Sequence, residues 1–73
     1  MYIVVESYDG EVNVTPCANI ESARYAKKQY QECIGEYNHE TVTDTDDYFS
    51  AEINEMLYEV EIRNENVLDI NIL

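Results

Sequence analysis

Residues 2–16 read YIVVESYDGEVNVTP, and this stretch decides the first half of the fold. Two segments rich in Val, Ile and Tyr flank Asp9-Gly10, and an Asp-Gly pair in that setting is a strong signal for a two-residue hairpin turn. Such a turn sets the register, with the pairs Tyr8–Glu11, Ser7–Val12, Val5–Val14 and Ile3–Pro16. The register predicts a core face made of four aliphatic side chains, Ile3, Val5, Val12 and Val14. It leaves Tyr8 on the solvent face.

An amphipathic helix is predicted over residues 20–37. Asn19 is a good N-cap, and Glu21 lies in the first turn, where the helix dipole favours an acid. Apolar residues recur at three- and four-residue spacing and form a stripe that would pack across the hairpin: Ile20, Ala23, Ala26, Tyr30, Cys33, Ile34 and Tyr37. We therefore expect Cys33 to be a buried, inert thiol, and we expect both cysteines, Cys17 and Cys33, to be free.

The second half of the chain is less regular. Residues 38–50 are polar and predict a loop, and the spacing of Phe49, Ile53, Met56 and Leu57 predicts a short helix. Strict alternation over 58–63 predicts a strand, which a three-residue turn would pair with 67–72. The expected result is one α+β domain over residues 1–73. It has an antiparallel sheet of two hairpins with one main helix on one face, in the order ββα(α)ββ.

The charge is the outlying feature of this 73-residue chain. Sixteen acids and four bases give a formal net charge of −12, whereas small soluble domains usually carry a magnitude of about 2–8. One explanation is solubility or adaptation to high salt. The other is a surface directed at Lys and Arg on a partner protein. Direct binding to nucleic acid or to an anionic membrane is disfavoured, because phosphates would be repelled.

The acids concentrate in the second half, with ten acids and no base between Lys28 and Arg63. Glu59 and Glu61 follow one another on one face of the predicted strand, roughly 6.6 Å apart. The predicted hairpin also sets Asp69 opposite Glu61, and like charges in that position destabilise a sheet. A local rule broken without structural gain suggests function, although long Glu side chains can also splay apart in water. The predicted partner-binding residues are Asp44, Asp46, Asp47, Glu52, Glu55, Glu59, Glu61 and Asp69.

Residues suited to catalysis or metal binding are scarce. His39 is the only histidine and lies in a polar stretch without a recognisable nucleophile and acid around it. The segment from Asp44 to Glu55 has acids at some calcium-loop positions, but Tyr48 and Phe49 occupy positions that need an oxygen ligand and a glycine. We expect no enzyme activity, no cofactor and no metal. With neither a signal peptide nor a membrane span visible, we expect a cytoplasmic protein.

In size, charge and α+β layout, the chain resembles the small acidic inhibitors encoded by bacteriophages, notably anti-CRISPR proteins and other DNA mimics. The resemblance is carried by the acid-rich segment from Asp44-Thr45-Asp46-Asp47 through Glu61, and by no diagnostic motif. It implies that the partner is the basic surface of a nucleic-acid-binding nuclease or CRISPR effector. The alternative is a regulatory or structural module without mimicry. Such a module could be a homodimer formed through the outer face of the first hairpin or an open sheet edge.

Overall fold

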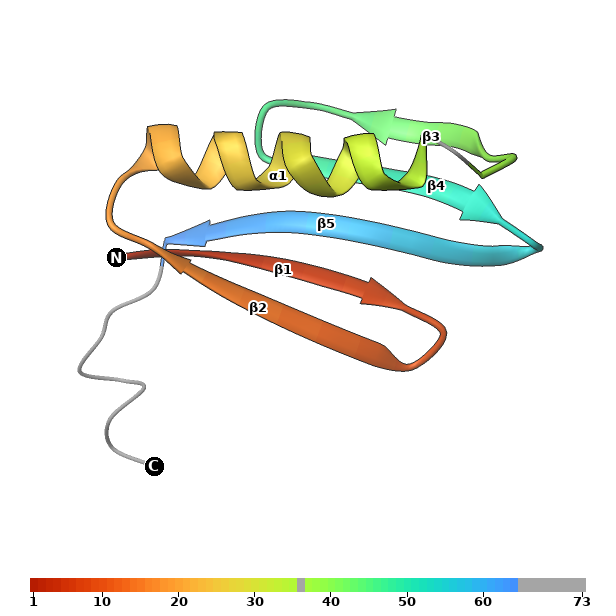
Figure 1. Ribbon diagram of the computed structural model, residues 1–73, viewed down its shortest axis with the longest axis horizontal. Coiled ribbons are helices and arrows are strands. Elements are labelled where there is room, and N and C mark those ends of the chain that lie inside the picture. Colours follow the sequence, from red (N-terminus) through yellow and green to blue (C-terminus); the bar gives the residue numbers. More distant parts are fainter. Residues whose placement is uncertain (36, 65–73) are drawn as a thin grey trace.

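The computed structural model describes residues 1–35 and 37–64. In this part of the chain, a five-stranded antiparallel sheet carries one helix on one of its faces (Figure 1). The elements, in chain order, are β1 (Tyr2–Tyr8), β2 (Glu11–Cys17), α1 (Ile20–Ile34), β3 (Glu40–Asp44), β4 (Tyr48–Ile53) and β5 (Met56–Asn64). The strand order is β2-β1-β5-β4-β3, which makes β5 the central strand. The predicted α+β class is confirmed.

The first hairpin forms as predicted. Asp9 and Gly10 both have positive φ, 50° and 81°, as a two-residue turn with left-handed residues requires. The observed pairs include Tyr8 with Glu11 and every other pair predicted from the turn. A one-residue error in register would have moved each side chain to the opposite face.

The predicted core face of this hairpin is wrong. Val4 is fully buried, whereas Val12 and Val14 are 61% and 55% exposed. Ile3 and Val5 share the exposed face with these valines and are only half-buried. Tyr8, predicted on the solvent face, instead packs against the core and donates a hydrogen bond from its hydroxyl to a carbonyl oxygen of β4.

Helix α1 begins at its predicted cap. The Asn19 side chain accepts a hydrogen bond from the backbone N–H of Ser22 at 2.8 Å, and this satisfies one of the free donors of the first turn. The helix ends at Ile34, three residues before the predicted end, with Gly35 as its C-cap. Cys33 is exposed, so the expectation of a buried thiol there is wrong; both cysteines are free, and the buried one is Cys17.

The second half of the chain departs most from prediction. Residues 40–44 form a strand rather than a loop, and the helix predicted around Phe49 and Ile53 is strand β4. Asn54 and Glu55, with φ of 53° and 67°, make a two-residue turn into β5. The predicted strand over 58–63 is present, but its neighbours are β1 and β4. The segment 67–72 that was expected to pair with it lies outside the described residues.

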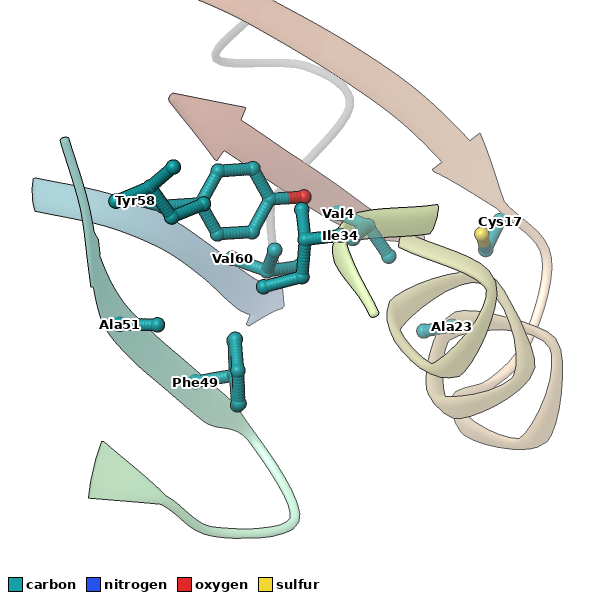
Figure 2. Close-up of a cluster of buried hydrophobic side chains, with 9 residues drawn as sticks. Val4, Cys17, Ala23, Ile34, Phe49, Ala51, Tyr58 and Val60 are labelled. Carbon is teal, nitrogen blue, oxygen red and sulfur yellow. The ribbon is translucent and has the colours of Figure 1, made fainter. Parts of the chain in front are cut away.

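The core lies between α1 and one face of the sheet, where side chains from every element except β3 meet (Figure 2). Its buried members are Val4, Cys17, Ala23, Ile34, Phe49, Ala51, Ile53, Tyr58 and Val60. Val4 and Val60 are fully inaccessible, and burying such a side chain stabilises the fold by about 1.5–3 kcal/mol. The ring of Tyr58 packs edge-on against Phe49, with ring centroids 6.4 Å apart. Within residues 1–35 and 37–64, no helix is long and apolar enough to cross a membrane.

Candidate functional site

The face of the sheet opposite α1 is the candidate functional site, and we call it the helix-free face. Strand residues paired in register point to the same side, so the ladder assigns each side chain to a face. Two rows run across four strands of the helix-free face: Val14, Val5, Glu61 and Tyr48 in one, and Val12, Ser7, Glu59 and Ser50 in the other. Each row is aliphatic or small on the β2–β1 side, and each carries its acid on β5.

The β1–β2 half of this face carries an aliphatic group, which we call the valine patch: Ile3 and Val5, which are half-buried, and Val12 and Val14, which are exposed. No element of the described chain covers these side chains, since α1 lies on the other side of the sheet (Figure 1). Single exposed apolar residues are ordinary, but a contiguous exposed group on a flat sheet is typical of a contact surface.

The β3–β4–β5 half carries four carboxylates, which we call the acidic row: Glu40, Glu52, Glu59 and Glu61. Glu40 lies directly opposite Glu52 in the β3–β4 ladder, which sets their Cβ atoms about 4.5–5.5 Å apart. Glu52 is a diagonal neighbour of Glu59, about 7–8 Å away. Glu59 and Glu61 alternate along β5 at roughly 6.6 Å. Four like charges therefore form a continuous line across three hydrogen-bonded strands.

Tyr48 fixes one member of this row. Its hydroxyl donates a 2.6 Å hydrogen bond to Glu59 Oε2 across the β4–β5 pair. Because that bond stabilises the protonated phenol, it raises the pKa of Tyr48 above the ordinary tyrosine value, and partial burial raises it further. The Glu59 side chain is half-buried, and this hydrogen bond holds it in one orientation. Glu59 is thus a positioned carboxylate.

Glu61 has a different neighbour. Arg63 follows it on the same face of β5, and its Nε lies 3.2 Å from Glu61 Oε1. Both side chains are about half exposed, and an exposed pair of this kind contributes little to stability. Arg63 partly offsets the negative charge at the Glu61 end, whereas the described ion pairs include none for Glu40, Glu52 or Glu59.

The structure gathers only some of the predicted partner-binding residues. Glu52, Glu59 and Glu61 share the helix-free face. Asp44 and Asp47 turn towards α1, where Asp44 Oδ1 lies 3.6 Å from Lys27 Nζ and Asp47 Oδ1 lies 3.7 Å from Arg24 Nη2.

The remaining predicted residues do not join the row. Asp46 lies in the turn between β3 and β4, and Glu55 lies in the turn between β4 and β5. Asp69 is outside the described residues. Both ladder neighbours of Glu61 are already taken, by Val5 of β1 and Tyr48 of β4, so the predicted pairing of Glu61 with Asp69 is replaced. The described structure therefore brings three of the eight predicted residues together on one face.

Glu40 is the member of the row that sequence reasoning missed. The segment around it was predicted to be a loop, so no cross-strand partner could be assigned. A usable signal was present: Glu40, Val42 and Asp44 alternate with three threonines, Thr41, Thr43 and Thr45, and β-branched residues favour strands. A bulge between Thr41 and Thr43 interrupts the alternation and hides it from a strict period-2 test.

His39 is exposed, and its Nδ1 lies 2.9 Å from the carbonyl oxygen of Tyr37. Among residues 1–35 and 37–64, no three His, Cys, Asp or Glu side chains come together in a way that could hold a metal ion. The chemistry that the helix-free face offers is therefore an ordered set of carboxylates beside an apolar patch. Comparison with known proteins adds no assignment, since no family model, no curated protein and no solved structure matches the chain.

Proposed function

We propose that this protein is an inhibitor that binds, through its helix-free face, the basic surface with which another protein holds nucleic acid. The observation that carries the proposal is the acidic row, Glu40, Glu52, Glu59 and Glu61, set in one line on a paired sheet. Its spacing of about 5–8 Å is similar to the distance between successive phosphates along one nucleic-acid strand. A groove of Lys and Arg that is arranged for phosphates offers charges of the complementary sign at that spacing.

The energetics favour such a partner. Positive charges in an empty groove repel one another, and a rigid acidic face relieves that repulsion on binding. A net charge of −12 also accelerates encounter with a basic surface and opposes encounter with nucleic acid itself. The valine patch lies next to the acidic row on the same face and would add apolar contact. Given the resemblance to phage-encoded inhibitors, we propose that the target is a nuclease or CRISPR effector of a bacterial defence system.

The test uses purified CRISPR effector complexes as probes and measures DNA binding and cleavage in the presence of the protein. Changing Glu52→Gln and Glu59→Gln together should weaken inhibition by at least about tenfold, because the loss of even one desolvated charge pair costs about 1.4 kcal/mol or more. The matched control is Glu21→Gln with Glu32→Gln, which removes the same charge from the exposed side of α1. That control should inhibit within about twofold of the natural protein, apart from slower association.

Salt supplies the second readout. Inhibition should weaken steadily as ionic strength rises, because screening shortens the reach of each exposed charge to about 8 Å at 0.15 M salt. Affinity that is independent of salt would refute the proposal. Equal losses in the row variant and the helix variant would also refute it, since net charge and not the row would then be responsible.

A second candidate function is a regulatory or structural module that self-associates without mimicry. The observation that favours it is the exposure of Val12 and Val14 on β2, which is an edge strand of the sheet formed by residues 1–35 and 37–64. Sedimentation at low micromolar concentration distinguishes the two. A stable dimer that dissociates on changing Val12→Asp and buries the acidic row would favour self-association, whereas a monomer that inhibits would exclude it.

A further inference from the structure

A hollow of about 420 Å³ lies on the opposite side of the molecule, beyond the C-terminal end of α1. In Figure 1, β4 and β5 continue past this end of the helix to their connecting turn, and the turn of the first hairpin lies at the same end of the molecule. The walls come from the first hairpin, from the β4–β5 turn and from the last residues of the helix. None of these wall residues belongs to the acidic row.

The hollow carries negative potential from three sources. Glu6 lies in its wall, half-buried, and Glu11 lies in the wall on the neighbouring strand. The C-terminal end of α1 borders it with the negative pole of the helix dipole, and the last turn has no basic residue. Among the described wall residues there is no Lys or Arg. A cation placed here would meet favourable charge from the sheet and from the helix.

Glu6 is fixed in place and still has acceptor capacity. Tyr58 donates its hydroxyl to Glu6 Oε2 at 2.5 Å, and Asn13 donates its amide to Glu6 Oε1 at 3.0 Å. An ionised carboxylate offers about four lone-pair positions, so these two bonds leave about two for a further donor. The described contacts include no ion pair for Glu6 or Glu11, so neither carboxylate is neutralised by the described chain.

Aromatic rings complete the wall. The rings of Tyr8 and Tyr58 lie 6.1 Å apart at 52°, and both hydroxyls are held, that of Tyr8 by the carbonyl oxygen of Ile53. Tyr37 adds an exposed ring from beyond the helix end. A planar cation beside the face of such a ring gains cation–π attraction.

We propose that this hollow binds the guanidinium group of an arginine side chain from a protein partner. Guanidinium matches the walls better than ammonium does, because it is planar, stacks on tyrosine and donates two parallel hydrogen bonds to a carboxylate. The site does not depend on the function proposed for the helix-free face, since it lies on the other side of the sheet. It would let the protein hold an arginine-bearing segment while the acidic row is engaged or free.

The test uses the peptides Gly-Arg-Gly and Gly-Lys-Gly as probes, with binding followed by amide shifts in two-dimensional NMR spectra. Gly-Arg-Gly should saturate and shift the amides of Glu6, Glu11 and Tyr58, and it should bind more tightly than Gly-Lys-Gly. Glu11→Gln should weaken this binding at least about tenfold, because it removes the charge that strengthens a hydrogen bond from guanidinium. Glu11 is exposed, so this variant folds even if Glu6→Gln disturbs Tyr58.

The matched control is Glu59→Gln, which removes one charge from the helix-free face and should leave the affinity for Gly-Arg-Gly unchanged. Cys33 gives an independent readout, because its exposed thiol lines the hollow while Cys17 is buried. Saturating Gly-Arg-Gly should slow alkylation of Cys33 by iodoacetamide at least threefold. Equal weakening by Glu59→Gln and Glu11→Gln, or unchanged alkylation of Cys33 at saturation, would overturn the proposal without affecting the function proposed for the acidic row.

Discussion

The two faces of this sheet are built from the same strands yet have opposite characters. Along β5, Tyr58 and Val60 point towards α1 and are 4% and 0% exposed, while Glu59 and Glu61 point the other way. Strand β1 is different, because Val4 on one face and Val5 on the other are both aliphatic. Alternation therefore assigns the faces of β5 by itself, but it cannot assign those of β1.

The neighbouring strand resolves the ambiguity. In the β1–β5 ladder, Val5 lies beside Glu61 and Ile3 lies beside Arg63. Placing Ile3 and Val5 in the core would therefore have buried Glu61 and Arg63, at a cost of several kcal/mol for each ion. The helix covers the other face because every strand except β3 supplies an apolar side chain there. The face of a hairpin is thus decided by the strand it pairs with, and the hairpin taken alone does not reveal it.

Two valines of the first hairpin, one on each face of the sheet, test whether only the helix-covered face is packed. Val4→Ala should lower the free energy of unfolding by about 2–3 kcal/mol, since it removes fully buried methyl groups and leaves a cavity. Val14→Ala should change it by less than about 0.5 kcal/mol, because that side chain is 55% exposed. Urea unfolding followed by circular dichroism measures both. Equal losses would mean that something covers the valine patch in solution, and the contrast between a packed face and an open face would fail.

The packed face also holds a charge. Lys27 is only 5% exposed, and its Nζ lies 2.6 Å from Gln31 Oε1 and 6.0 Å from the centre of the Phe49 ring. Its partner Asp44 remains 55% exposed at the side chain, so water screens the ion pair. We infer that the stem of Lys27, more than its charge, stabilises the edge of the core.

Two substitutions of Lys27 separate the contribution of its stem from that of its charge. Lys27→Ala should cost about 2 kcal/mol, from roughly three buried methylenes at about 0.8 kcal/mol each. Lys27→Met keeps most of that length and should cost less than about 1 kcal/mol. Thermal unfolding at matched salt distinguishes them. If Met is as costly as Ala, the charge is required, and the packed face depends on an ion pair as well as on apolar burial.

Two turns of the same kind explain how much of the fold could be predicted. Asp9-Gly10 and Asn54-Glu55 both have left-handed φ at each position. The first carries glycine, so the sequence predicted the turn and the full register. The second carries glutamate where glycine is favoured, and the apolar residues around it also fit a helical period. The helix predicted over 49–57 was therefore wrong, and β3 and β4 were missed with it.

The acidic row likewise contains residues that the sequence could place on one face and residues that it could not. Glu59 and Glu61 were placed on one face of a strand because alternation along β5 is unambiguous. Glu40 and Glu52 could not be placed, because their proximity depends on the β3–β4 pairing of strands that the sequence did not predict. The ion pair of Asp44 with Lys27 depends in turn on how α1 crosses the sheet. The local sequence pattern predicted which acids lie together along β5. Whether the other acids lie close to them depends on strand pairing and helix packing, which the local pattern does not reveal.

Each face of the sheet holds a tyrosine with a raised pKa, Tyr58 on the helix-covered face and Tyr48 on the helix-free face. The pKa of Tyr58 is raised chiefly by burial and then by its hydrogen bond to Glu6, whereas that of Tyr48 is raised chiefly by its hydrogen bond to Glu59. An unfolded tyrosine ionises near pH 10. Because both folded pKa values lie above that, their contribution to stability is complete below about pH 10 and is lost as pH rises beyond it.

Glu59→Gln should therefore separate the faces with a small effect on stability. Replacing the carboxylate by an amide removes a charged acceptor, so the pKa of Tyr48 should fall towards its ordinary value. The pKa of Tyr58 on the helix-covered face is raised so far that this ring should stay protonated over the measured pH range in both proteins. The measurement is the ring carbon shift of each tyrosine between about pH 8 and pH 12, around the ordinary value. If Tyr48 titrates identically in both proteins, the bond from Tyr48 to Glu59 does not persist in solution, and Glu59 is a freely moving side chain. If the ring carbon shift of Tyr58 also changes, the two faces are electrostatically coupled through the sheet. A partner bound to the acidic row would then alter the electrostatic environment of the core.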